Sequence, residues 1–434
     1  MLKSLAVLDI FRTFVPVNEK VTDISEALLT MTEEMRLMRE TIDSQHADKG
    51  APQWRPVDPM RHHREKGWDY RGRAIYHFTL PVEQRFPLFG TLEGDCAEAA
   101  YVRLNAFGRR VCRMLSGLAQ FYKEKGYALK VLAQMVMPDH LHLVIQVLEP
   151  LPQSIGVVVR GFKSGCTKVY KEEFYCSGEN AAEVHGETSA AAMQDGPPVQ
   201  FARIFAGRGS IWQQDKAYYH ERILHAPGQL RRMIDYVKDN PRRLWLKSHN
   251  PSLFKLHRQT VAAGLSFTSM GNHFLLYWPE GQTVEVSRRA TDDQIAERLR
   301  SALASAHDGA VTFTAAISKG EQVIARALRE QGYPLVVLLN AGFPKVGSPH
   351  ERYYKPGGVY FEACSKGLLL LLEPTEAAFS DAAIQEAVAE TLRRKAEERH
   401  YCYTPIPLTS QRYRFVALNE MAKRLAANTA ANAS

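Results

Sequence analysis

Residues 137–145 read Met137-Pro138-Asp139-His140-Leu141-His142-Leu143-Val144-Ile145, so that two histidines alternate with apolar residues. Alternation predicts a strand, in which every second side chain points to the same face. His140 and His142 therefore share one face, and the apolar residues point to a core on the other. A lone His-x-His pattern is ordinarily a solvent-facing pair. This pair directly follows a Pro-Asp turn and begins an apolar strand, so we expect it to share a metal ion.

A second polar pair lies in residues 234–241, where Tyr236 and Asn240 are four residues apart. On a helix this spacing puts both side chains on one face. The carbonyl oxygen of Asn240 is then a candidate third metal ligand, with Tyr236 one turn away. A hard ion such as Mg²⁺ accepts carbonyl oxygens, and a mixed set with imidazole nitrogens is tolerated. Taken alone, Tyr236 would be interpreted as an aromatic residue packed on an amphipathic helix.

The segments around these two motifs predict an antiparallel sheet with helices on one face. Residues 66–250 form one predicted domain, in which residues 176–200 are an inserted loop. Residues 1–65 are a predicted N-terminal helical extension. Pro241 is expected to end the last helix of the domain. The expected strands are 74–80, 129–137 and 141–148, the extended segment is 211–223, and the expected helices are 97–125, 155–174 and 227–240.

A polar stretch over residues 247–259 separates a second pattern, in which short apolar strands alternate with helices. Such alternation predicts an α/β domain with a mostly parallel sheet over residues 260–425. Ser318 and Glu321 have the spacing of a capping box at a helix start. Residues 426–434 are expected to be a disordered tail. The expected strands are 273–278, 283–287, 311–314, 335–339 and 368–373, and the expected helices are 292–305, 319–331 and 381–399.

Composition restricts the class of protein more than its function. The chain has 434 residues, a formal net charge of +8 and six cysteines without a CxxC pair. The length suggests two or three domains, and the scattered cysteines favour a reducing cytoplasm over disulfides or a cysteine zinc site. The apolar runs are too short to span a membrane. Basic residues cluster beside both motifs, as expected for contact with a phosphate backbone, although solvated helix faces have the same composition.

In their order along residues 68–246, these segments resemble the His-hydrophobic-His single-tyrosine transposases, especially the REP-associated tyrosine transposases. The resemblance implies a ferredoxin-like catalytic domain and cytoplasmic, nucleoid-associated DNA as the place of action. The segments that carry the resemblance are Leu88-Phe89-Gly90, the Met-Pro-Asp-His-Leu-His block, Phe162-Lys163, Ile211-Trp212-Gln213 and Tyr-x-x-x-Asn-Pro at 236–241.

The same resemblance implies a role for each residue. His140, His142 and Asn240 would be ligands of Mg²⁺ or Mn²⁺, and Tyr236 would be the nucleophile that forms a 5′-phosphotyrosine. The implied substrate is single-stranded or hairpin DNA. Apart from the resemblance, Asp215 and His220 are alternative ligands because they lie near the site in sequence. Trp212, Tyr218 and Tyr219 are candidate base-stacking residues, with core packing favoured for Trp212. The implied phosphate contacts are Arg160, Lys163, Arg231, Arg232, Arg242 and Arg243.

The second domain faintly resembles the Rossmann-like domain of DNA-processing protein A, but it contains neither a GxGxxG nor a Walker pattern. We therefore expect it to aid DNA binding rather than to carry a second reaction. Two alternatives to a transposase stay open at this point: a related replication initiator or relaxase, and a domesticated DNA-binding protein that is no longer mobile. The sequence also leaves open whether the chain acts as a monomer or a homodimer.

Overall fold

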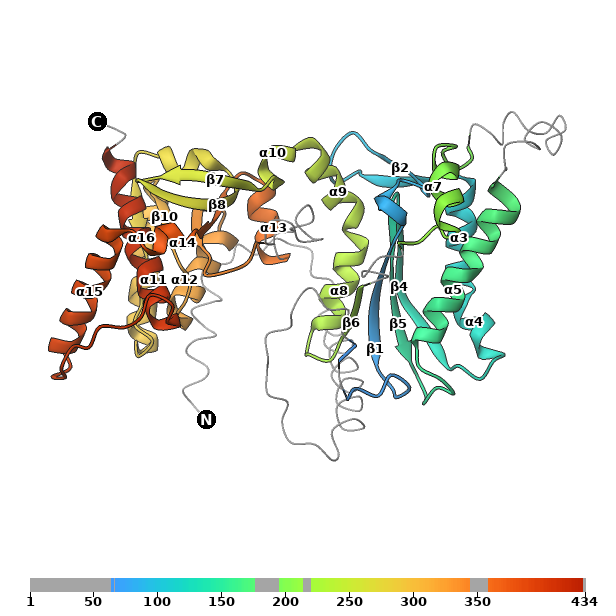
Figure 1. Cartoon of the computed structure of the whole chain (residues 1–434), viewed down its shortest axis with the longest axis horizontal. Coiled ribbons are helices and arrows are strands. Elements are labelled where there is room, and N and C mark those ends of the chain that lie inside the picture. The colour runs from blue at the N-terminus through green and yellow to red at the C-terminus, as the bar shows by residue number, and fades with distance from the viewer. Residues whose placement is uncertain (1–63, 66, 176–194, 214–219, 344–357, 432–434) are drawn as a thin grey trace, which may run out of the picture. The chain divides into compact units, whose positions relative to one another are not determined.

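The computed structural model describes residues 64–65, 67–175, 195–213, 220–343 and 358–431. The expected N-terminal extension, apart from its last two residues, and most of the expected inserted loop lie outside the described residues. The chain divides into two compact units between Pro241 and Arg242, and the second unit also includes Cys96–Ala99. Each unit is a sheet covered by helices (Figure 1). Among the helices described, none is long and apolar enough to cross a membrane.

The first unit contains an antiparallel sheet in the order β4-β5-β1-β6, as expected for this part of the chain. β5 begins directly at His140 because the turn before it consists of only two residues. The register of β1 and β5 pairs Thr79 with His142. The strands are β1 (Ile75–Pro81), β4 (Leu129–Met137), β5 (His140–Val147) and β6 (His220–Ile223).

Helices cover both faces of this sheet, whereas the sequence predicted them on one. The second face is covered by α8 (Gln229–Lys238), because the apolar stripe of this helix packs on Ile75 and Val144. The first face carries the larger core, to which four helical elements contribute (Figure 1). These are α3 (Ala106–Ser116), α4 (Leu118–Lys123), α5 (Gly156–Val169) with its π-helical end η2 (Tyr170–Phe174), and α7 (Phe201–Arg208).

The expected single helix over residues 97–125 is wrong. Its first part forms β3 (Tyr101–Leu104), which pairs with β2 (Gly90–Glu93). Helical structure starts only after Asn105, whose side chain accepts a hydrogen bond from the Gly108 amide as an N-cap. Gly117 then separates α3 from α4. The N-cap and the glycine are local signals that outweigh the apolar periodicity of the whole stretch.

Helical structure continues past Pro241, which was expected to end it. α9 (Asn240–His249) follows α8 directly, with Pro241 in its first turn. Proline is tolerated there because a first-turn amide has no partner within the helix. Part of the expected polar linker is also ordered, as α10 (Pro251–Phe254) and the beginning of a strand. The short 3-10 helix η1 (Glu83–Arg85) follows β1.

The second unit contains a mixed sheet in the order β7-β8-β12-β11-β10-β9. β9 to β12 are parallel to one another, as expected, whereas β8 runs antiparallel to β12 and pairs with β7 in a hairpin. The expected strand over residues 273–278 is wrong, because this segment is the 3-10 helix η3 (His273–Tyr277). Of the expected strand 283–287, only residue 283 lies in a strand. The strands are β7 (His257–Ala262), β8 (Leu265–Gly271), β9 (Gly281–Thr283), β10 (Val311–Thr314), β11 (Leu335–Leu338) and β12 (Leu369–Pro374).

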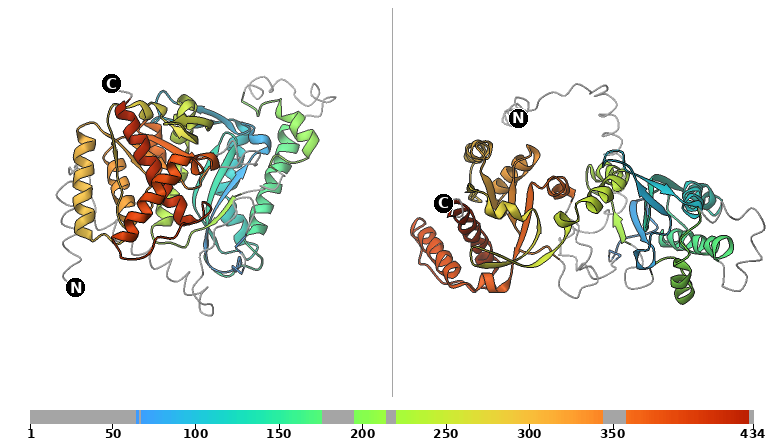
Figure 2. Two further views of the ribbon diagram at one scale, coloured as in Figure 1. Left: turned by 60° about the vertical axis from the view of Figure 1, so that its left-hand side comes forward. Right: turned by 90° about the horizontal axis from the view of Figure 1, so that it is seen from above.

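Helices also cover both faces of the mixed sheet, and the two red C-terminal helices lie on one of them (Figure 2). The expected disordered tail is wrong for residues 426–431, which belong to the last helix. Leu425 and Ala426 are buried in the core of this unit, so core packing reaches the first residue of the expected tail. One face carries α11 (Asp292–His307), α12 (Lys319–Glu330) and α13 (Gly358–Ser365), and the other carries α14 (Glu376–Phe379), α15 (Ala382–Glu397) and α16 (Gln411–Ala431).

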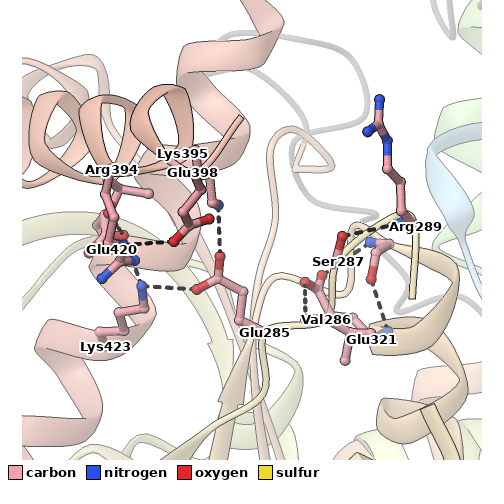
Figure 3. Close-up of polar contacts among 12 residues, drawn as sticks. Glu285, Val286, Ser287, Arg289, Glu321, Arg394, Lys395, Glu398, Glu420 and Lys423 are labelled. Atoms are coloured by element: carbon pink, nitrogen blue, oxygen red, sulfur yellow. Dashed lines mark hydrogen bonds and ion pairs between the residues drawn. The ribbon is translucent and has the colours of Figure 1, made fainter. Parts of the chain in front are cut away.

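Two buried or half-buried carboxylates of the second unit are saturated with hydrogen bonds (Figure 3). Glu321 accepts from the backbone amides of Val286, Ile317 and Ser318 at 3.1, 2.7 and 3.1 Å. The expected capping box between Ser318 and Glu321 is therefore confirmed. Glu285 forms ion pairs with two lysines, one on α15 and one on α16, at 3.1 and 2.9 Å. Both carboxylates thus join separate segments of the unit.

Candidate active site

His140 and His142 project from β5 toward α8. The neighbouring Val144, two residues further along the same face, packs in the core beneath α8, whereas Leu141 and Leu143 belong to the core on the opposite face. Both histidines are buried, with 5% and 1% of their surface exposed. The alternation seen in the sequence therefore places the pair on one face, as expected from the strand period.

The two imidazoles and the side chain of Asn240 converge at one point. The Nε2 atoms of His140 and His142 are 3.1 Å apart, and the Nε2 atom of His142 is 3.2 Å from Oδ1 of Asn240. The amide nitrogen of Asn240 donates to the backbone carbonyl of Tyr236 at 2.7 Å. This bond identifies the atom facing the histidines as the carbonyl oxygen. Three potential metal-binding atoms from two elements thus meet in a buried position.

His140 is oriented by the turn that precedes it. Its Nδ1 atom donates to the carboxylate of Asp139 at 2.5 Å, and Arg85 pairs with the same carboxylate at 2.8 Å. Burial by itself raises the pKa of Asp139. The hydrogen bond from His140 and the positive charge of Arg85 outweigh that effect, so the pKa lies below its usual range. An ionised Asp139 fixes the His140 proton on Nδ1 and leaves Nε2 as the unprotonated nitrogen.

His142 is held on its other side by two residues of β1 that the sequence reasoning missed. Its Nδ1 atom lies 3.0 Å from Nε2 of His77 and 3.1 Å from Oγ1 of Thr79. The rings of His77 and His142 are stacked at 5.2 Å. Burial, reinforced by nearby positive charges, lowers the pKa of His77 to about 4, so it is neutral at pH 7. The sequence does contain a signal for His77 and Thr79, because they are polar residues at alternate positions of a largely apolar strand.

Tyr236 lies against the same histidines. Its ring meets His142 edge-on at 5.5 Å and His77 edge-on at 6.3 Å. α8 is anchored by its apolar stripe, and Val237 on that stripe is fully buried. The helix therefore brings Tyr236 to the histidine face, one turn before Asn240. The structure places all four residues of the predicted site together.

The basic residues predicted to contact DNA fall into two groups. In the first unit, Arg160 is exposed on α5 and Lys163 is partly buried on the same helix. Burial lowers the pKa of Lys163 to about 8. On α8, Arg231 and Arg232 are exposed, and Arg231 pairs with Asp235 at 3.2 Å. Arg160, Arg231 and Arg232 are therefore accessible to a phosphate backbone.

Arg242 and Arg243 belong to the second unit, and both contact side chains of α13 in that unit. Arg242 forms an ion pair with Glu362. The guanidinium of Arg243 lies 3.6 Å from the ring centroid of Phe361, and the residue is buried. These contacts give both arginines a role in packing, so the implied phosphate contact at Arg243 in particular conflicts with its burial.

Of the remaining candidates, Asp215, Tyr218 and Tyr219 lie outside the described residues. Trp212 is buried in the core, where its indole N–H donates to the Lys163 backbone carbonyl at 2.9 Å. Core packing is therefore the role the structure gives it. His220 is exposed on β6, in register with Thr79 of β1.

The donor set suits a divalent cation on chemical grounds. Imidazole nitrogens and a carbonyl oxygen are all ligands that such ions accept. The carboxylate of Asp139 accepts a hydrogen bond from Nδ1 of His140, and metal-binding histidines commonly have such a carboxylate partner. Within the described ranges, no group of three or more His, Cys, Asp or Glu side chains is placed to hold a metal. A metal here would therefore depend on the histidine pair and the amide oxygen of Asn240.

Comparison of the chain with protein-family models and with curated proteins gave no match.

Proposed function

We propose that the chain is a metal-dependent tyrosine DNA transposase that cleaves and rejoins single-stranded or hairpin DNA. One observation carries this proposal: α8 brings Tyr236 to the face of the sheet that bears His140 and His142, with Asn240 directly after the helix. A phenol, two imidazoles and an amide oxygen then occupy one small region. Strand transfer through a phosphotyrosine needs a nucleophile beside a cation site, and this arrangement would provide both.

The topology supports the same proposal. The order β4-β5-β1-β6, with helices between β1 and β4 and between β5 and β6, fits the βαββαβ pattern of a ferredoxin-like domain. The four parallel strands of the second unit, with helices on both faces, fit a Rossmann-like domain. For the second unit we propose a contribution to DNA binding.

In the proposed reaction, the hydroxyl oxygen of Tyr236 attacks the phosphorus of the scissile linkage, and the bond from that phosphorus to the 3′ oxygen breaks. Tyr236 loses its phenolic proton and the leaving 3′ oxygen gains one. The products are a 5′-phosphotyrosine and a free 3′ hydroxyl. Because a phosphate ester is conserved, attack by a 3′ hydroxyl on the phosphotyrosine rejoins DNA without ATP.

The site residues contribute by binding and orientation. His140, His142 and Asn240 would hold Mg²⁺ or Mn²⁺, which when bound offsets the negative charge of the phosphate. Asp139 orients His140, and the backbone carbonyl of Tyr236 orients the Asn240 amide. The latter bond links nucleophile and ligand within one turn. Arg160, Lys163, Arg231 and Arg232 are the proposed phosphate contacts of the first unit.

The test is a covalent adduct between the full chain and single-stranded hairpin DNA from the flanks of its gene. With Mn²⁺ present, the wild type should form an adduct that survives denaturing electrophoresis. Tyr236→Phe should reduce its yield below detection while hairpin binding stays nearly unchanged, because only the hydroxyl is lost. Tyr101→Phe removes an exposed hydroxyl of the same unit and serves as the matched control.

Two outcomes would change the proposal. A wild-type yield of adduct from Tyr236→Phe would show that another residue is the nucleophile. Stable nicked DNA without rejoined product from the wild type would favour the related relaxase-type nickase, which shares the histidine pair and the tyrosine chemistry.

A further inference from the structure

The two nitrogens of His142 have different kinds of neighbour. Nδ1 faces His77 and Thr79 of β1, at 3.0 and 3.1 Å. Nε2 faces His140 and Asn240, at 3.1 and 3.2 Å. A neutral imidazole has one N–H and one unprotonated nitrogen, so only one side of the ring can donate. The position of that single proton decides whether Nε2 has a lone pair for a metal ion.

On the Nε2 side, both neighbours present acceptors. The oxygen of Asn240 faces His142 because the amide nitrogen is bonded to a backbone carbonyl. Nε2 of His140 is unprotonated because its proton is held on Nδ1 by Asp139. A proton on Nε2 of His142 would satisfy these acceptors and would block metal binding. Without that proton, three acceptor atoms face one another, and a cation among them would stabilise that arrangement.

On the Nδ1 side, His77 and Thr79 can receive the proton. Nε2 of His77 lies at hydrogen-bond distance, and its ring is stacked on His142 and held in a buried strand. The Thr79 hydroxyl can donate as well as accept, so it suits either position of the proton. With Nε2 of His77 as the acceptor, the tautomer of His142 that carries its proton on Nδ1 would be favoured.

We propose that His77 is a positioning residue, which accepts the Nδ1 proton of His142 and thereby keeps Nε2 open as a metal ligand. It does for His142 what Asp139 does for His140. The inference rests on the proposed function in that it assumes a cation bound by the histidine pair. It adds a residue of β1, His77, to the set that controls metal binding. His77 lies 65 residues before His142, the ligand that it orients.

The experiment compares His77→Phe with His77→Gln. Phenylalanine keeps a flat aromatic ring but cannot accept a proton, whereas the side-chain carbonyl of glutamine can accept one at about the position of Nε2. His225→Phe, at an exposed position of the same unit, is the matched control. Mn²⁺ affinity is measured by calorimetry on the full chain, and the tautomer of His142 by ¹⁵N NMR with Mg²⁺. Thermal unfolding shows that each variant is folded.

We expect His77→Phe to bind Mn²⁺ at least about tenfold more weakly than the wild type, with the His142 proton shifted to Nε2. His77→Gln should recover most of the affinity and keep the proton on Nδ1. A purely structural role for His77 would give the reverse order, because phenylalanine replaces a packed ring better than glutamine does.

Equal Mn²⁺ affinity in the wild type and His77→Phe, or a proton on Nε2 of His142 in the metal-bound wild type, would overturn the inference. A wild type that binds no Mn²⁺ at all would instead contradict the metal assignment of the proposed function. The two failures are therefore distinguishable.

Discussion

Both units of this chain bury polar side chains, but the neighbours of those side chains differ. In the second unit, Glu321 is an acceptor surrounded by three donors, and Glu285 lies between two lysines. In the first unit, the facing atoms of His140, His142 and Asn240 are all potential acceptors. A polar group with complementary neighbours holds a fold together. A group of like acceptors is an arrangement that a bound cation stabilises.

Because the buried polar groups of the two units differ in this way, we expect substitutions in the two units to have separate effects. Changes at the histidine face should affect metal binding and strand cleavage, with little effect on the stability of the fold. Changes at the saturated carboxylates should affect the free energy of unfolding and leave the chemistry intact.

The largest expected effect is that of His142→Ala. Loss of a central ligand should remove measurable Mn²⁺ binding and reduce the DNA adduct below detection, because the remaining pair of ligands is insufficient. Asn240→Ala should weaken Mn²⁺ binding less, since water can replace one neutral oxygen ligand. The measurements are calorimetry and adduct yield, with thermal unfolding as the control for folding. Undiminished cleavage by the wild type in excess EDTA would contradict the assignment.

Glu321→Ala should have the largest effect on stability in the second unit. It leaves three backbone amides without their acceptor, and Glu321 is 2% exposed, so water cannot easily replace it. The expected loss in the free energy of unfolding is about 3 kcal/mol. Urea unfolding measures it, with Glu330→Ala at the exposed end of the same helix as the control. Adduct yield at 25 °C should not change. A loss of adduct in the folded variant would contradict the expectation that the two units respond separately to substitution.

A smaller effect is expected from pH at Lys163. Its pKa of about 8 lies below the usual value because of burial, so raising the pH from 7 to 9 removes its positive charge. If Lys163 contacts phosphate, the affinity of the wild type for hairpin DNA should fall about tenfold over this range. Lys163→Arg stays charged at pH 9 and should lose much less. Equal losses in the two proteins, measured by fluorescence anisotropy, would exclude Lys163 from the DNA contact.

Local patterns in the sequence predicted the central part of the first unit well. The strand period gave both ends of β1, β4 and β5 to within one residue, and the helical period put Tyr236 and Asn240 on one face. The same reasoning failed where two local signals competed. Apolar periodicity over residues 97–125 suggested one helix, although Asn105 and Gly117 divide the segment. Pro241 was assigned to a helix end, although proline also suits a helix start.

The sequence by itself determined which side chains share a face, because the strand and helix periods depend only on neighbouring residues. It therefore paired His140 with His142, and Tyr236 with Asn240. Only the tertiary structure decided that α8 packs on the histidine face and that His77 meets His142, since sheet register joins segments far apart in the chain. It also gave Arg243 a buried contact on Phe361. Contacts of this kind depend on how whole elements pack, and no short stretch of sequence encodes them.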